Sequence, residues 1–115
     1  MIFHIPIKLP SLANTRMHWR KMASLKKKQR SATKLCMFIA TSGVPTAIPP
    51  LPLLITIARI GPRKLDDDNL ASACKYVRDQ IATAVGVDDG SSQYTWQYKQ
   101  KIGAYGVDVE ITPRQ

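Results

Sequence analysis

The sequence predicts a single α/β (α+β) domain covering residues 1–115, with a mixed sheet and two main helices in the order β-α-β-α-β-β. Two observations support this fold class. Segments that alternate apolar and polar residues, as strands do, are separated by two longer segments whose apolar residues recur at helical spacing. A chain of 115 residues, 44% of them hydrophobic, is long enough to bury one core but too short for two.

The first half of the chain predicts two strands around a long helix. Residues 3–9 alternate apolar and polar side chains, which indicates a strand with one buried face, and Pro6 within it favours an edge position. From Arg16 to about Thr41 the chain contains no Pro or Gly and carries apolar residues at helical spacing, which predicts one long amphipathic helix. Its expected apolar stripe consists of Trp19, Met22, Leu25, Ala32, Leu35 and Ile39. After a proline-rich connection, the apolar run of residues 53–58 predicts a central strand buried on both faces.

The second half predicts another helix and two strands. Apolar residues recur at helical spacing from about Asp68 to Val85, and Gly86 is suited to end such a helix. Residues 93–102 and 107–112 are typical of short strands, and the connection between them predicts a hairpin.

The distribution of charge is the strongest indication of function. The net charge is +9, residues 1–50 contain nine Lys and Arg but no Asp or Glu, and six of the eight acids lie between residues 66 and 89. Crowded carboxylates repel one another unless a cation lies among them, and a basic surface attracts a polyanion. Together these features indicate a metal-dependent enzyme that cuts nucleic acid, although charge alone also fits a basic ribosome-like or membrane-surface protein.

Cysteine use and hydropathy indicate a cytoplasmic protein without a membrane partner. Cys36 and Cys74 lie far apart without paired spacing, which is typical of reduced core thiols. The N-terminus does not have the pattern of a signal peptide, and the longest apolar stretch, residues 51–58, is too short to span a bilayer as a helix.

The acids form two groups, and each group alone has an ordinary explanation. Asp66, Asp67 and Asp68 precede a predicted helix, where acids cap the backbone and favour the helix dipole, and the segment Asp88-Asp89-Gly90 is typical of a turn. Three acids from two loops would nevertheless suit Mg²⁺, which prefers oxygen ligands and can activate water for phosphodiester hydrolysis. Structural calcium is the competing hypothesis, but the spacing does not match an EF-hand loop.

The predicted helix between the two groups implies a dimer. A helix over residues 68–85 would separate its ends by roughly 25 Å at about 1.5 Å per residue, so Asp68 and Asp89 of one chain could scarcely share a metal. A two-fold dimer with antiparallel helices would bring Asp66 and Asp68 of one chain toward Asp89 of the other. We therefore expect an obligate homodimer with two composite sites.

The acidic motif resembles that of a known family. The run from Leu65 to Leu70, with Asp-x-Asp-Asn at a helix start and a second acidic pair some twenty residues later, is similar to the RusA family of Holliday-junction resolvases. Leu9-Pro10-Ser11 and Asn14 also resemble the N-terminal loop of that family. The resemblance implies a RusA-like fold and a dimeric, Mg²⁺-dependent endodeoxyribonuclease, with Mn²⁺ as a substitute, that resolves four-way DNA junctions by paired nicks. It also implies that Asp66, Asp68 and Asp89 are the metal-binding catalytic acids.

One position departs from the family pattern. The family often has a Lys four residues after the second acid, where this chain has Ser72. Lys75 lies on nearly the same predicted helix face as Asp68 and is a candidate catalytic replacement, although an ordinary exposed Lys beside Asp79 is as good an explanation. Two other readings therefore remain open: a branched-DNA-binding architectural protein with weak or no catalysis, and a DNA nuclease that is less selective for structure.

Basic residues of the first helix are the expected DNA contacts, because each phosphate contact adds sequence-independent affinity. Arg63 and Lys64 flank the acids and are expected to hold the scissile phosphate. Tyr94, Trp96 and Tyr98 alternate along one strand, where core or dimer packing is favoured over base stacking. The full set of expected DNA-binding residues is Asn14, Arg16, Arg20, Lys21, Lys26, Lys27, Lys28, Arg30, Arg63, Lys64 and Asn69.

Overall fold

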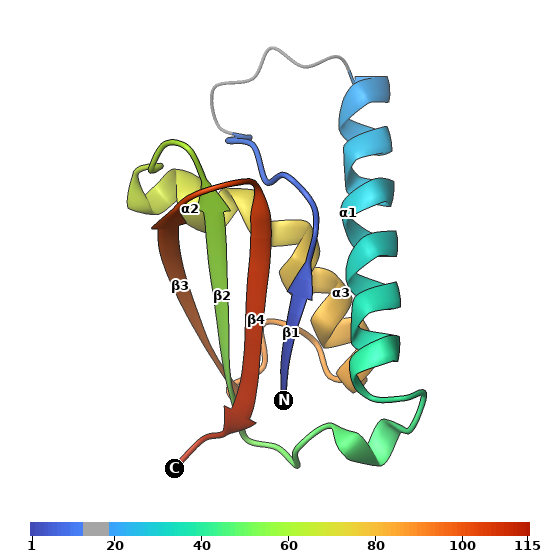
Figure 1. The fold of residues 1–115 in the computed structure, drawn as a ribbon. Helices are drawn as coiled ribbons and strands as arrows, with labels where there is room; N and C mark the ends of the chain where they lie inside the picture. Colours follow the sequence, from blue (N-terminus) through green and yellow to red (C-terminus); the bar gives the residue numbers. More distant parts are fainter. Residues whose placement is uncertain (13–18) are drawn as a thin grey trace.

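The computed structural model describes residues 1–12 and 19–115 and shows a mixed four-stranded sheet with helices packed on one face (Figure 1). The predicted fold class and the single mixed sheet are confirmed. The elements in chain order are β1 (Ile2–Ile5), α1 (Trp19–Ala40), the 3₁₀ turn η1 (Pro45–Ala47), β2 (Leu53–Gly61), α2 (Asp67–Ala73), α3 (Lys75–Val85), β3 (Tyr94–Ile102) and β4 (Gly106–Pro113).

The strand order is β1-β4-β2-β3, with β2 parallel to β3 and β4 antiparallel to both of its neighbours. The predicted hairpin is therefore wrong, because β2 lies between β3 and β4. Parallel neighbours need a crossover connection, which α2 and α3 supply between β2 and β3. The chain then passes over the end of β2 through residues 103–105, where the Gly103 N–H donates to the Gly61 carbonyl at 3.0 Å, so that β4 pairs with the other edge of β2.

The sheet has one covered face and one open face. Leu53, Ile55 and Ile57 of β2 point into the core and are fully buried, whereas Leu54 and Thr56 on the opposite face are only half-buried. The predicted central position of this strand is confirmed, but the prediction that both of its faces are buried is wrong over much of its length. In the view of Figure 1, α2 and α3 lie behind the sheet and α1 lies beside α3 and β1, so no described element covers the front.

The N-terminal strand is shorter than its pattern. β1 ends at Ile5 because Pro6 has no N–H for the ladder, and β1 lies at the edge of the sheet as expected. Burial continues to alternate beyond the strand, since Ile7 is 9% and Leu9 0% exposed. This extended segment is held by Arg59, whose Nε donates to the Leu9 carbonyl at 2.7 Å.

The long helix is present, but its predicted apolar stripe is partly wrong. Trp19, Leu35 and Ile39 are exposed by 68%, 59% and 65%. The buried face instead follows Gln29, Thr33 and Met37, one helical turn apart. Met22, Leu25, Ala32 and Cys36 are half-buried beside these residues. The Thr33 hydroxyl is satisfied by the Gln29 carbonyl at 2.8 Å, which allows a polar residue to occupy a core position.

The predicted second helix is two helices. α2 and α3 meet at Cys74, whose backbone N–H is shared between the Leu70 and Ala71 carbonyls at 3.2 Å each. Burial raises the pKa of the Cys74 thiol to about 12. Gly86 ends α3 in the left-handed conformation (φ 90°), as the sequence predicted. None of the described helices combines the length and apolar character needed to cross a membrane.

Candidate metal and DNA site

The first acidic group lies at the start of α2 and has no partner in the described chain. Asp66 is the N-cap residue, yet its carboxylate makes no capping hydrogen bond, although its carbonyl accepts the Leu70 N–H at 2.8 Å. Asp66, Asp67 and Asp68 are all exposed, and no ion pair within the described residues involves them. Capping by a side chain therefore does not account for Asp66, while Asp67 and Asp68 in the first turn still favour the helix dipole.

The segment that carries these acids is fixed to β3. Gln100 of β3 bonds both sides of the Leu65 peptide: its Oε1 accepts the Leu65 N–H, and its Nε2 donates to the Leu65 carbonyl, each at 2.8 Å. Because Leu65 immediately precedes Asp66, this double hydrogen bond sets the position of the acidic group relative to the sheet.

The second acidic group is held by Arg78 of α3. The Arg78 guanidinium donates to Asp89 Oδ2 at 3.0 Å, to the Asp89 carbonyl at 3.1 Å and to the Tyr98 hydroxyl at 2.9 Å. It also stacks over the Trp96 ring at 4.8 Å, and Trp96 Nε1 donates to the same Asp89 carbonyl at 3.0 Å. Asp89 is thus pinned by a helix and a strand together, with one carboxylate oxygen engaged by Arg78.

Asp88 has the ordinary role that its turn motif predicts. Its Oδ2 accepts the Gly90 N–H at 3.0 Å, which is the pattern of an Asx turn.

Charges around this loop influence two neighbouring groups. Burial alone would lower the pKa of Arg78, but its hydrogen bond to Tyr98 and the negative charge of Asp89 raise that pKa above the usual value. Burial raises the pKa of Tyr94, the nearby negative charges of Asp88 and Asp89 raise it further, and the Tyr94 hydroxyl donates to the Val87 carbonyl at 2.8 Å. Arg78 therefore remains cationic and Tyr94 remains a neutral phenol across the physiological pH range.

The separation of the two acidic groups differs from the expected geometry. The loop after α3 folds back, so Asp89 lies beside Arg78, only ten residues after Asp68 along α2 and α3. Ten helical residues correspond to roughly 15 Å, rather than the length of the whole predicted helix. Even so, the part of the chain that the structure describes contains no group of three His, Cys, Asp or Glu side chains placed to hold a metal ion.

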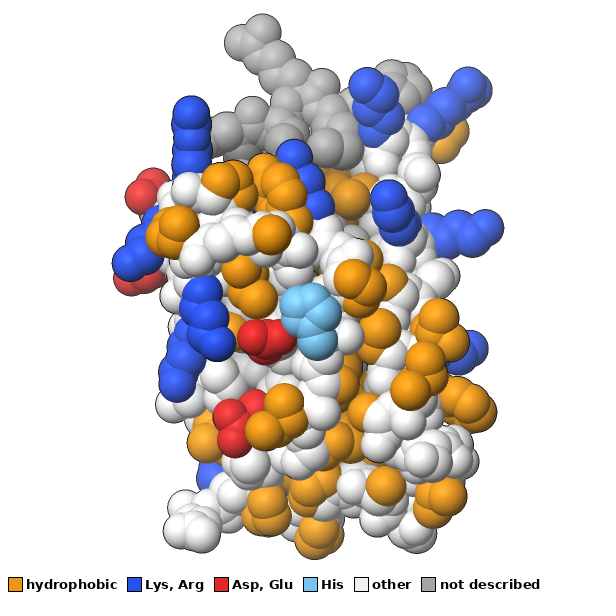
Figure 2. All heavy atoms as spheres, viewed as in Figure 1, with side chains coloured by type: hydrophobic (Ala, Val, Ile, Leu, Met, Phe, Trp, Pro, Cys, Tyr) orange, Lys and Arg blue, Asp and Glu red, His pale blue; other side chains and the backbone are white. Residues whose placement is uncertain are grey.

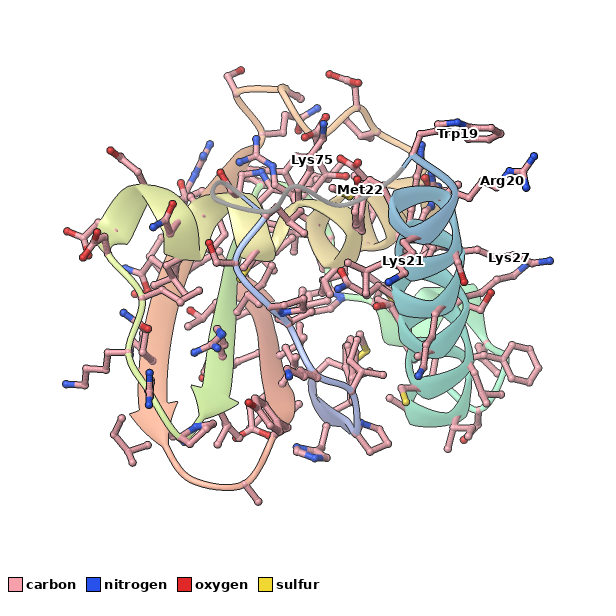
Figure 3. All side chains as sticks on the ribbon, turned by 90° about the horizontal axis from the view of Figure 1, so that it is seen from above. Trp19, Arg20, Lys21, Met22, Lys27 and Lys75 are labelled. Atoms are coloured by element: carbon pink, nitrogen blue, oxygen red, sulfur yellow. The ribbon has the colours of Figure 1, made fainter. Side chains whose placement is uncertain are left out.

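A cleft of about 350 Å³ adjoins the second acidic group, and its described lining includes none of the acids of the first group. Its lining includes Asp89, Arg78 and Tyr98, and also Ser72, one turn after Asp68. Lys75 is exposed and borders this cleft as well as a second one that it shares with Met22 and Tyr76, and Figure 3 shows Lys75 and Met22 near each other. Lys75 is exposed, as the ordinary explanation for this lysine expects, and no ion pair joins it to Asp79 in the described residues.

The predicted DNA-binding residues of α1 form two groups. Arg20, Lys21, Lys26, Lys27 and Lys28 are exposed. Figure 3 shows Arg20 and Lys27 pointing outward with Trp19, and Figure 2 shows the cationic side chains on the upper part of α1, with apolar ones lower down.

Arg30 has a structural role instead. It bonds the Gln80 Oε1 at 3.1 Å and the Thr83 hydroxyl at 3.2 Å, and so joins α1 to α3.

The remaining predicted residues lie apart from α1. Arg63 and Lys64 are exposed beside the first acidic group, and Asn69 is half-buried in α2. Asn14 and Arg16 lie outside the described residues.

Sequence reasoning missed Arg78, Gln100 and the anchoring role of Trp96. Arg78 gives no distinctive sequence signal, because Asp79 and Gln80 follow it directly in the predicted helix, and no local pattern pairs it with Asp89. Comparisons with known proteins found no matching family model, no matching curated protein and no matching solved structure.

Proposed function

We propose that the protein is a Mg²⁺-dependent, structure-specific endodeoxyribonuclease of the RusA type, which acts as a cytoplasmic homodimer and resolves Holliday junctions by paired symmetric nicks. One observation carries the proposal: Asp66 and Asp68 are exposed carboxylates without partners among the described residues, held at a fixed place in a chain of net charge +9. Carboxylates that neither cap nor pair are available to a cation, and the basic surroundings favour a polyanionic substrate. The order and spacing of the acidic motifs, which resemble the RusA family, support the same reading.

The side chains present fit Mg²⁺ in their chemistry. Asp66 and Asp68 offer hard oxygen ligands, and Mg²⁺ usually takes only one or two carboxylates, with waters and substrate phosphates completing its shell. Asp89 has one oxygen on Arg78 and the other without a hydrogen bond in the described chain, so it could supply a third ligand in the orientation that Arg78 sets. When bound, the metal would polarise the phosphodiester and lower the pKa of an attacking water.

The basic side chains would position the substrate. Lys75, which lines the same cleft as Asp89, can place a positive charge near the scissile phosphate in the role of the lysine that Ser72 replaces. Arg63 and Lys64 flank the first group, and the exposed basic residues of α1 would follow the DNA backbone. Arg30 contributes to this surface indirectly, by holding α1 against α3.

A second candidate function is a branched-DNA-binding protein with little or no catalysis. Two observations favour it: Ser72 stands where the family has a lysine, and no three acids come together within the described part of one chain. In that case the basic surface would retain its function while the acids would not. A nuclease without preference for branched substrates is a further variant.

The test is nicking of a synthetic four-way junction with and without Mg²⁺. We expect Mg²⁺-dependent paired nicks by the unchanged protein, at least 100-fold slower nicking by Asp68→Asn, and unchanged nicking by Glu110→Gln, which removes an exposed acid from the open sheet face. A loss of about 100-fold or more is expected for a direct metal ligand, because mutating even the outer-shell partners of metal ligands typically costs about 10- to 100-fold. Junction binding without nicking would favour the architectural protein, and equal cleavage of linear duplex would favour the unselective nuclease.

A further inference from the structure

The outer edge of β3 is a long strand edge without a partner. β3 has nine residues, lies at one end of the sheet and pairs only with β2. No other described segment forms a ladder with its free edge. Such an edge is a template for another strand, and proteins that do not use one commonly shorten it, cover it or place lysines on it. β3 carries Lys99 and Lys101 but is neither short nor paired at this edge with another described segment. The opposite edge of the sheet, β1, is four residues long and is followed by Pro6.

β3 also connects both acidic groups. Near its beginning, Trp96 holds the Asp89 carbonyl, and near its end, Gln100 holds the Leu65 peptide that precedes Asp66. Trp96 and Gln100 are on the same face of the strand, since their ladder partners in β2 are the buried Ile55 and Arg59. Four strand residues span roughly 13 Å, so one β3 carries the two half-sites at separate points on its helix-covered face.

We propose that β3 pairs antiparallel with β3 of a second copy of this chain, and that this edge-to-edge contact assembles the composite site. Antiparallel pairing centred on Tyr98 would place Trp96 of each copy opposite Gln100 of the other. The Asp89 loop of each copy would then adjoin the Asp66 segment of the other. This gives two equivalent composite sites related by one two-fold axis. The proposal rests on the proposed function for the identity of the site, while the contact itself can be tested without metal or DNA.

The side chains of β3 are compatible with this register. On the open face of the sheet, Gln97 would lie opposite Lys99, and Thr95 opposite Lys101, so no lysine faces another directly. On the helix-covered face, Ile102, which is 61% exposed in one chain, would gain Tyr94 as a neighbour. The cleft lined by Arg78, Asp89 and Tyr98 would open onto the interface, where the second copy could close it.

Disulfide trapping tests the register directly. In a Cys36→Ala background, Gln97→Cys combined with Lys99→Cys should give a covalent dimer under mild oxidation, because directly opposed strand residues lie within disulfide range. Gln97→Cys alone is the matched control and should give at least tenfold less dimer, since its counterpart would then lie diagonally, about 7 to 8 Å away. Ile39→Cys in the same background tests whether the two copies instead associate through the exposed apolar part of α1.

The charge at position 97 gives a second, non-covalent measurement. Gln97→Lys would face Lys99 of the second copy and should weaken the dimer several-fold in sedimentation, whereas Gln97→Glu should strengthen it. A wholly monomeric unchanged protein at tens of micromolar, or covalent dimers from Ile39→Cys and none from β3, would overturn the proposal. If the β3 cysteines cross-link but the protein without these substitutions fails to nick junctions, the interface is supported and only the proposed nuclease activity is contradicted.

Discussion

Arg78 is the residue on which the candidate site most depends. It joins α3, the loop that carries Asp89 and the strand β3 through three hydrogen bonds, and it stacks on Trp96. The planar guanidinium can make these contacts at once because its donors have a fixed fork geometry, which a lysine ammonium cannot reproduce. The pKa of Arg78 is raised by the same partners, so its positive charge is secure.

Replacing Arg78 by Lys should therefore destabilise the protein although the charge is kept. We expect the free energy of unfolding to fall by roughly 1 to 2 kcal/mol, the scale of lost hydrogen bonds to a charged group that is partly exposed. Urea denaturation followed by circular dichroism measures this. Lys75→Arg, at an exposed neighbour in the same helix, is the control and should leave the midpoint unchanged; equal midpoints for all three proteins would contradict the role of Arg78.

At the scale of elements, α1 is divided along its length. The part from Arg20 to Arg30 carries six Lys and Arg, whereas the part from Ser31 to Ala40 carries only Lys34 and exposes Leu35, Phe38 and Ile39. Within the described residues, no ion pair neutralises Lys27 or Lys28. An exposed cationic surface of this kind fits contact with a phosphate backbone and contributes little to the stability of the fold.

Lys27→Gln should reduce DNA affinity without changing stability. If Lys27 contacts a phosphate, the slope of the logarithm of the binding constant against the logarithm of salt concentration should decrease by about one. Lys34→Gln removes the same charge from the apolar part of α1 and should leave the slope unchanged. Fluorescence anisotropy with a labelled junction at several salt concentrations gives both slopes, and an equal effect of the two substitutions would show that α1 attracts DNA only through net charge.

The sequence was a good guide to individual elements where the pattern was strong. The apolar run of β2, the helix-ending Gly86 and the edge position implied by Pro6 were all correctly predicted. The stripe of α1 was not, because Gln29 and Thr33 occupy buried positions while Trp19, Leu35 and Ile39 are exposed, and no local preference indicates which helix face a tertiary partner will cover. The division at Cys74 was missed for a similar reason, since no Pro or Gly marks it.

At the scale of the whole molecule, strand order was beyond the reach of local patterns. Residues 103–106 have the length and composition of a hairpin turn, yet β2 separates β3 from β4 and takes a partner on each edge. The same lack of long-range information hid the contact of Arg78 with Asp89 and of Gln100 with Leu65, which place the acids. The assignment of Asp66, Asp68 and Asp89 as metal ligands stays a prediction, and the fold shows that both acidic groups are attached to β3.

The central claim is that each active site needs Asp66 and Asp68 from one chain and Asp89 from another, and mixing two inactive variants tests it most directly. Asp68→Asn and Asp89→Asn should each fail to nick a four-way junction with Mg²⁺. In a mixed dimer with composite sites, one site would carry both substitutions and the other neither, so unfolding and refolding the two variants together should restore junction nicking to about a quarter of the unchanged protein, as single nicks. If each site instead lay within one chain, every site in the mixture would carry one substitution, and a mixture as inactive as its components would contradict the claim.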